Sequence, residues 1–409
     1  MIMKKQLLLF ALMLLPVAAR SYDIEVKNAD GVTIFYNYVN NGLELEVAKG
    51  GYSGNVNIPE EVTFMNITRK VTGIGDWAFK SCNYLLSINI PNSVESIGIG
   101  AFQDCRGLTS INIHNGVTSI GNQAFDHCSS LSSIIIPSTV TAIGVGAFQG
   151  CTGLNSILVD HDNKIYDSRD YCNAIIETST NTLLTGCNQT IIPNSVTSIG
   201  ENAFNGCASL TSIIIPTSVT SIDEKAFYGC TSLTSIIIPN SVTSIDKKVF
   251  EGCTSLTSIT LPNSITSISS RTFRDCTSLS SITIPSSVRS IGEGAFNGVD
   301  FSFVISLVEI PFAINGTDYY DDNVFNKNTF YNAILYVPEG SIDNYKSTEG
   351  WKDFVNIVEG IPMGIENIKA KKQEAISFYR LDGKHVDLPK PGMIVIKRSG
   401  QKNVKVVMK

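Results

Sequence analysis

Residues 226–246 read Ala-Phe-Tyr-Gly-Cys-Thr-Ser-Leu-Thr-Ser-Ile-Ile-Ile-Pro-Asn-Ser-Val-Thr-Ser-Ile-Asp, and this stretch recurs with small changes along much of the chain. Its phenylalanine returns at intervals of 23 residues, with one longer step, at Phe79, Phe102, Phe125, Phe148, Phe204, Phe227, Phe250, Phe273 and Phe296. A cysteine keeps the same register at Cys82, Cys105, Cys128, Cys151, Cys207, Cys230, Cys253 and Cys276. Self-similarity at a fixed period of this length is typical of solenoids.

The pattern within one unit indicates two short extended segments. Leu233, Ile236 and Ile238 form an L-x-x-I-x-I strand with alternate residues pointing inward. Pro239 ends that strand because proline has no N–H to donate to a ladder. Val242 begins the second extended piece. One unit cannot bury its apolar face alone, so we predict a β-rich solenoid of stacked 23-residue repeats.

The repeat pattern L-x-x-I-x-I-P-x-x-V-x-x-I-x-x-x-A-F-x-x-C resembles the BspA-like (TpLRR) leucine-rich repeats of bacterial and protist surface proteins. The resemblance covers roughly residues 60–300. It implies a curved leucine-rich-repeat solenoid, and it implies adhesion to host or extracellular-matrix proteins as the expected activity.

The two ends of the chain differ from the repeats. Residues 1–21 combine two lysines, an apolar run and small residues, which predicts a secretory signal peptide. Residues 22–60 alternate apolar and polar side chains and are expected to form an N-terminal β cap. The BspA-like repeats are expected over 61–312. Residues 313–362 resemble the closing cap of BspA-like proteins.

The predicted C-terminal cap and one enlarged repeat have specific features. In the cap, Tyr336, Trp351 and Phe354 are predicted to cover the last open core. The repeat at about 155–192 is enlarged, because Phe148 and Phe204 are 56 residues apart. Two extended runs around Ser179-Thr180-Asn181 predict a hairpin there.

Residues 363–409 are expected to form a separate small β-module with three short strands. The Leu381-Asp-Gly-Lys turn, the strand at Gly392 and the final Lys/Val strand resemble the C-terminal sorting domain of type IX secretion substrates in Bacteroidetes. Met393 departs from that pattern, because the family often carries tyrosine there. A plain β-module without a sorting role is the alternative.

No pattern in the sequence indicates catalysis, a cofactor or a metal. A net charge of −6 argues against nucleic acid as a partner, since nucleic-acid binding calls for a basic face. The four histidines lack metal-ligand spacing, and His114 and His127 are expected to be exposed repeat substitutions. The aspartates near Gly316 lack an ordered calcium-loop spacing and are interpreted as a solvated turn. We therefore predict that the chain is not an enzyme.

Eight of the ten cysteines occupy the repeat position, which favours a reduced, buried ladder. Cys172 and Cys187 stand outside that column and are the candidates for a disulfide bridge.

The residue between the two inward isoleucines of each strand is expected to face solvent. In the middle of the stack it is aliphatic, and these positions are the predicted partner-binding residues: Ile135, Leu158, Ile191, Ile214 and Ile237. A column of serines runs alongside, for example at Ser212 and Ser235. An apolar stripe rimmed by hydroxyls is typical of a binding patch. Alternatively, the isoleucines serve only the β propensity of exposed strand positions.

These features together predict a secreted or cell-surface binding protein, on the bacterial outer surface, that recognises a protein or glycan partner outside the cell. No later stretch is long and apolar enough for a transmembrane segment in the mature chain. The C-terminal module offers a route of surface attachment. The alternative function is a structural surface protein that assembles through its repeats.

Overall fold

The computed structural model describes residues 21–314 and 323–360, and between 377 and 407 it describes four short strands. The signal peptide predicted for 1–21 lies outside the described residues except for Ser21. The acidic turn at Asp318, Asp321 and Asp322 also lies outside them.

The first strands form a β cap that continues directly into the repeats. Three strands pair antiparallel in the order β1 (Ile24–Lys27), β2 (Thr33–Val39) and β3 (Glu44–Val47), with η2 (Asn40–Gly42) between the last two. β3 then pairs in parallel with β6 (Ile67–Ile74), which forms a hairpin with β5 (Glu61–Phe64). This parallel pairing places the cap on the open end of the first repeat.

The described repeats contribute short strands to two rows. The first row holds β4 (Gly54–Asn57), β7 (Leu85–Asn89), β10 (Ser133–Ile136), β12 (Ser156–Val159), β17 (Ser212–Ile214), β19 (Ser235–Ile237), β21 (Ser258–Thr260) and β23 (Ser281–Ile284). The second row holds β8 (Ser96–Ile97), β9 (Ser119–Ile120), β11 (Ala142–Ile143), β16 (Ser198–Ile199), β18 (Ser221–Ile222), β20 (Ser244–Ile245), β22 (Ser267–Ile268) and β24 (Ser290–Ile291). Pairing within each row is parallel and joins residues 23 positions apart between regular repeats, such as Ser235 with Ser258, whereas β4 and β7 pair residues 32 positions apart, such as Asn55 with Ser87.

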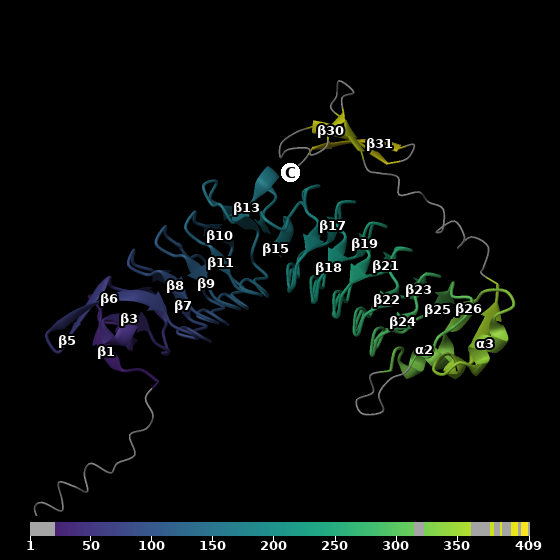
Figure 1. The fold of residues 1–409 in the computed structure, drawn as a ribbon, viewed down its shortest axis with the longest axis horizontal. Coiled ribbons are helices and arrows are strands. Elements are labelled where there is room, and N and C mark those ends of the chain that lie inside the picture. Colours follow the sequence, from purple (N-terminus) through teal and green to yellow (C-terminus); the bar gives the residue numbers. More distant parts are fainter. Residues whose placement is uncertain are drawn as a thin grey trace, which may run out of the picture.

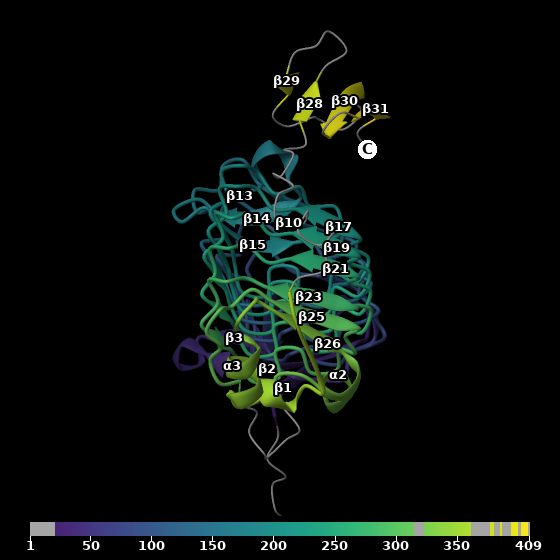
Figure 2. The same ribbon diagram turned by 90° about the vertical axis from the view of Figure 1, so that its right-hand side faces the viewer.

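The stacked repeats form a curved solenoid, as the sequence pattern predicts. Figure 1 shows the strands side by side along a bent axis, with β1 and β3 at one end and α2 and α3 at the other. Figure 2 looks along the stack, and the chain winds around a common centre. The apolar side chains of every repeat fill that centre.

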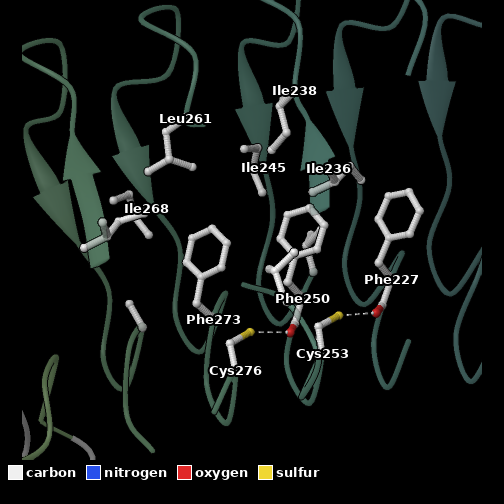
Figure 3. Packing of buried hydrophobic residues seen from close by; sticks show 14 of the residues in the cluster. Phe227, Ile236, Ile238, Ile245, Phe250, Cys253, Leu261, Ile268, Phe273 and Cys276 are labelled. Carbon is white, nitrogen blue, oxygen red and sulfur yellow. Dashed lines mark hydrogen bonds between the residues drawn. The ribbon is translucent and has the colours of Figure 1, made fainter. Parts of the chain in front are cut away.

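The phenylalanine column stacks ring on ring. Consecutive rings such as Phe227 and Phe250 lie 5.0 to 5.5 Å apart between centroids and are close to parallel, in one stack from Phe79 to Phe148 and another from Phe204 to Phe296 (Figure 3). The rings are wholly buried or nearly so. Offset stacking of this kind adds to the stabilisation that comes from burying the ring area itself.

The cysteines form a second ladder beside the rings. The Sγ of Cys253 donates to the carbonyl oxygen of Phe227 at 3.2 Å, and Cys276 donates to Phe250 at 3.1 Å (Figure 3). The same bond recurs at Cys105, Cys128, Cys151 and Cys230. All ten cysteines are buried free thiols, which confirms the reduced ladder. Cys172 and Cys187 are also free in the structure, so the bridge considered for them is not formed.

The enlarged repeat forms the predicted hairpin and continues the second row. Its elements are β13 (Tyr166–Asp167), η3 (Arg169–Tyr171), β14 (Ala174–Glu177) and β15 (Thr182–Gly186). β14 and β15 pair antiparallel, which confirms the hairpin, and β15 pairs in parallel with β16. Gly186 lies flat against Phe204, where an added Cβ would come within 2.1 Å of the ring, so no larger residue fits.

The enlarged repeat also divides the core in two. One apolar cluster includes residues from Ile24 to Val159, and the other includes residues from Leu183 to Phe354. β14 lies between them: Ile175 belongs to the first cluster, whereas Ala174 and Ile176 belong to the second. Its residues therefore contact a core on each face.

The far end of the solenoid is closed by a mixed cap. Its elements are β25 (Phe303–Ser306), α2 (Lys327–Asn332), β26 (Ile334–Val337), α3 (Ile342–Ser347), η4 (Trp351–Asp353) and β27 (Asn356–Glu359). Trp351 and Phe354 are buried against Phe325, as predicted.

The prediction for Tyr336 is wrong. Leu335 and Val337 take the inward positions of β26, so Tyr336 faces outward and is only half-buried. Tyr345 fills the interior instead, and its hydroxyl donates to Ser306 at 2.6 Å.

The tail contains four short strands where the sequence predicts three. They pair antiparallel in the order β29 (His385–Val386), β28 (Ser377–Tyr379), β30 (Ile394–Ser399) and β31 (Lys402–Val407). The turn at Leu381 and the residues around Met393 lie outside the described residues.

We predict that the thiols are unreactive in the folded protein. Burial raises the pKa of Cys151, Cys172 and Cys253 to about 12, so almost no thiolate is present at pH 8. DTNB titration is expected to detect ten thiols in denaturant and less than one within minutes under native conditions. Fast native labelling of several thiols would contradict this, and eight thiols in denaturant would indicate that Cys172 and Cys187 pair.

Candidate functional site

The predicted binding residues face solvent, and four of the five lie on the first row of strands. Their exposed fractions lie between 43 and 61% for Ile135, Leu158, Ile191, Ile214 and Ile237. Each isoleucine that flanks them in sequence, such as Ile236 and Ile238, is buried. The alternation along the strand therefore separates core positions from surface positions as the repeat pattern predicts.

The five residues do not form one uninterrupted ladder. Ile135 pairs with Leu158 across β10 and β12, and Ile214 pairs with Ile237 across β17 and β19. Ile191 belongs to no strand, and its N–H donates to the carbonyl of Cys172. The enlarged repeat thus separates the apolar stripe into two pairs with Ile191 between them in sequence.

A groove opens beside the first of these pairs. It has a volume of about 470 Å³ and is lined by Ile135, Leu158, Val159, Asp160, His161, Ser168, Arg169 and Tyr171. One wall is the outward face of β10 and β12, and the other is η3. Sequence reasoning missed this groove. The only signal for it is the insertion that follows β12, because an insertion beside a sheet is able to return over the strand face.

Several hydrogen bonds fix the wall that η3 provides. The hydroxyl of Ser168 accepts from the N–H of Val159 at 3.0 Å and donates to the carbonyl of Ala174 at 2.6 Å. The guanidinium of Arg169 pairs with Asp167 at 2.7 Å and donates to Asn181 at 2.8 Å. These bonds connect η3 to β12, β13 and the β14–β15 hairpin. The groove is therefore preformed in the absence of a ligand.

Asn163 anchors the loop between β12 and β13. Its buried amide donates to the carbonyls of Pro137 and Val140, both at 2.9 Å. Its oxygen accepts from the N–H groups of Ile165 and Tyr166, also at 2.9 Å. Asn163 therefore bonds the valine carbonyl of the preceding repeat, as a hydroxyl does in other repeats, for example Ser218 to Val196, and it holds its own loop as well.

The backbone near η3 adopts an uncommon conformation. Asp170, Tyr171 and Asn173 all have positive φ, at 58°, 54° and 53°. For a bulky side chain such as tyrosine the left-handed region is disfavoured. The same turn leaves Tyr171 exposed over 74% of its surface at the edge of the groove. Such strain is often found at binding sites.

One group of potential metal ligands lies at the groove. The ligand atoms of Asp160, His161 and Asp162 lie within 4.8 Å of one another. His161 contacts both carboxylates at 3.4 Å, and two of the three residues are exposed. Exposed acidic groups of this kind are common without an ion, and we assign no metal to them.

The two histidines of the repeats differ from each other. His127 is exposed, as predicted, and its ring bonds to the buried carboxylate of Asp126. His114 is only half-buried, and its Nδ1 accepts from the N–H of Gly116 at 2.8 Å. The expectation of an exposed His114 is therefore wrong, because the ring fills the position of the repeat proline.

Comparison with known families agrees with the geometry of the repeats. Residues 58–176 and 181–302 match the family described as the BspA type leucine rich repeat region, in six copies. The match covers more than half of the chain. The chain belongs to this family of BspA-type leucine-rich-repeat proteins. No curated protein matches it.

Solved structures include several similar solenoids. The pneumococcal vaccine antigen PcpA is 16% identical, with 84% of this chain and 100% of PcpA covered and a TM-score of 0.52, which shows a shared fold. A leucine rich cell surface protein from Faecalibacterium prausnitzii is 21% identical over 84% of this chain and 97% of its own, with a TM-score of 0.41. A leucine-rich repeat protein from Bacteroides ovatus is 27% identical over 83% and 100%, with a TM-score of 0.29.

Among the residues that the structure describes, no helix combines the length and hydrophobicity needed to cross a bilayer.

We predict that Asn163→Ala destabilises the enlarged repeat. The substitution removes four hydrogen bonds, two to the carbonyls of Pro137 and Val140 and two from the N–H groups of Ile165 and Tyr166, and each lost bond is worth about 0.5–1.5 kcal/mol. We expect the free energy of unfolding to fall by about 2–4 kcal/mol in urea titrations. Asn240→Ala, at an exposed turn, is the control and should leave it unchanged. Equal stability of both variants would contradict the anchoring role.

Proposed function

We propose that this BspA-type protein is a secreted or cell-surface binding protein that recognises a protein or glycan partner outside the cell through the first row of strands. The observation that carries the proposal is the exposure of Ile135, Leu158, Ile214 and Ile237 on ordered strands. Exposed apolar side chains in one row, flanked by serines such as Ser235, resemble the centre and rim of a protein interface.

The rival interpretation is that these residues only favour the strand conformation. Exposed β-branched residues do stabilise neighbouring strands, by up to about 1 kcal/mol per cross-strand pair. Threonine also favours strands, however, and the outer repeats carry Thr260 and Thr283 at this position without loss of the fold. Strand propensity alone therefore does not explain why isoleucine or leucine, and not threonine, occupies this position in the middle of the row. Binding of an apolar partner surface would explain it.

The proposed location rests on the ends of the chain. The signal peptide at 1–21 would direct export, and residues 363–409 would form the module for sorting or surface attachment, as the resemblance to type IX substrates of Bacteroidetes implies. That module carries eleven lysines and arginines against four aspartates and glutamates, whereas residues 22–362 carry 17 against 33. An anionic surface would attract the basic module and repel the acidic solenoid. The module is therefore suited to surface attachment, with the repeats directed away from that surface.

Relatives support the same assignment. The protein from Faecalibacterium prausnitzii is described as a cell surface protein, and PcpA is described as a vaccine antigen. We extend a surface role from them to this chain, with the domain organisation 22–60, 61–312, 313–362 and 363–409 that the sequence predicts.

We predict that a double substitution, Ile214→Lys with Ile237→Lys, weakens partner binding and leaves folding intact. The two side chains are neighbours and more than half exposed, so lysine is tolerated there but places two charges in the patch. The purified full chain would be tested against immobilised matrix proteins, mucin and glycans. We expect saturable binding to one class and at least a ten-fold loss of affinity in the double variant.

The control for this experiment has the same charge and spacing. Thr217→Lys with Asn240→Lys adds two lysines 23 residues apart at exposed turns beside the same strands. We expect it to bind as the unmodified chain does. Equal binding by both double variants would refute the strand face as the binding surface.

A second candidate function, assembly into a surface layer, is favoured by one observation. β27 pairs only with β26 among the described strands, and it leaves Val355 and Val358 exposed at 63 and 43% at the end of the stack. An open strand edge is a template for pairing with another chain. Self-association on a sizing column, without binding to any ligand class, would favour this role.

A further inference from the structure

We propose that the groove beside η3 is the principal contact site for a protein partner, and that it takes an extended segment in which an apolar side chain neighbours a lysine or arginine. This inference rests on the proposed binding function. It goes further by naming the place on the solenoid, which is the enlarged repeat, and the chemistry of the ligand.

The floor of the groove selects an apolar side chain. Ile135 and Leu158 present their outward side chains there, with 59 and 43% of their surface exposed, and Val159 lies beneath them. Tyr171 stands at the edge with 74% of its surface exposed. An apolar side chain placed between Leu158 and Tyr171 would remove apolar area on both partners from water, which is the main driving force for association.

The rim of the groove selects a positive charge. In the described part of the chain, the one cationic side chain that pairs with Asp160 and Asp162 is His161, at 3.4 Å, and His161 is itself exposed. The guanidinium of Arg169, by contrast, is engaged by Asp167 and Asn181. The rim therefore offers the carboxylate of Asp160, with that of Asp162 next to it across His161, and no competing free cation from η3. A lysine or arginine beside the bound apolar side chain would find its partner there.

The charge of the whole solenoid points the same way. Residues 22–362 hold 33 acidic and 17 basic side chains, a net charge of −16. A negative field over the binding face speeds the encounter with a basic partner and slows it with an acidic one.

The size and rigidity of the groove fit a short peptide segment. A volume of about 470 Å³ exceeds what one apolar side chain needs and leaves room for its neighbours in an extended chain. Ser168 ties the η3 side of the groove to β12 and β14 through half-buried hydrogen bonds, and Asn163 anchors the intervening loop through buried ones. The groove is therefore largely ordered before a ligand binds.

A glycan fits the floor less well. Two branched aliphatic side chains form most of it, and sugar hydroxyls placed against them would lose hydrogen bonds to water without replacement. We therefore commit to a protein segment, and glycan binding becomes an outcome of the test.

The test uses the full chain and a set of labelled nine-residue peptides with a central Phe-Lys or Leu-Arg pair. Matched peptides carry Phe-Glu or Ser-Lys at the centre. Fluorescence anisotropy is expected to show at least ten-fold tighter binding of the apolar–basic peptides than of either control. Their affinity should fall with added salt, because the carboxylates of Asp160 and Asp162 contribute.

Variants locate the binding. Leu158→Lys should weaken the apolar–basic peptides at least ten-fold, and Asp160→Asn with Asp162→Asn should remove most of the preference for Phe-Lys over Phe-Glu. Tyr171→Ala lies on an exposed turn and is the second variant, should Leu158→Lys unfold the chain. Asn240→Lys, at an exposed turn several repeats away, is the matched control and should bind within two-fold of the unmodified chain.

Three outcomes would overturn the proposal. The first is equal affinity for Phe-Lys and Phe-Glu peptides. The second is loss of peptide binding with the Ile214→Lys and Ile237→Lys double variant but not with Leu158→Lys, which would leave the proposed binding function standing and move its site to the second aliphatic pair. The third is no peptide binding together with glycan binding that Leu158→Lys weakens, which would keep the groove and reject its protein ligand.

Discussion

The whole structure depends on the contact between each inward side chain and its counterpart 23 residues away. A repeat of this size has too little apolar surface to form a core, so its stability comes from the repeats on either side. Phe227 touches Phe250, and Cys253 bonds to the carbonyl of Phe227. Side chains of the same volume must therefore recur at the same place, because a change in one repeat alters the packing of two neighbours. Because the same inward side chains recur in each repeat and supply the stability, the outward residues are free to differ between repeats.

The same constraint explains both ends and the enlarged repeat. A stack always has two open faces, and each must be covered by side chains that do not continue the pattern. The strands β1–β3 do this at one end, and Trp351, Tyr345 and Phe354 do it at the other. In the enlarged repeat, Gly186 lies against the ring of Phe204, where a side chain would not fit. The β14–β15 hairpin takes the place of one regular repeat there. The groove arises between β12 and η3, in the part of the enlarged repeat that precedes that hairpin.

The sequence alone predicts much of the fold and little of the site, and the reason is periodicity. Inward and outward positions within a repeat follow from counting, so the buried phenylalanines, the cysteine ladder and the exposed Ile214 and Ile237 were all predictable. Tyr336 was misplaced because the cap has no period from which to infer which face of β26 is inward. The thiol-to-carbonyl bonds and the groove were missed because they depend on where the backbone lies in three dimensions. The sequence of residues 160–171 has no pattern that predicts that Tyr171 and Leu158 line the same groove.

The partition of the core at β14 has a mechanical consequence. If the chain tethers a cell to a partner as proposed, it carries tension along its length. Two apolar clusters meet at the β14–β15 hairpin: Ile176 and Leu183 belong to one, Ile175 belongs to the other, and Leu184 packs against the latter. Elements in series carry the same force, so we expect the solenoid to extend first where its core is divided. The loop that forms the groove leads into this hairpin, and extension there would therefore change the shape of the groove.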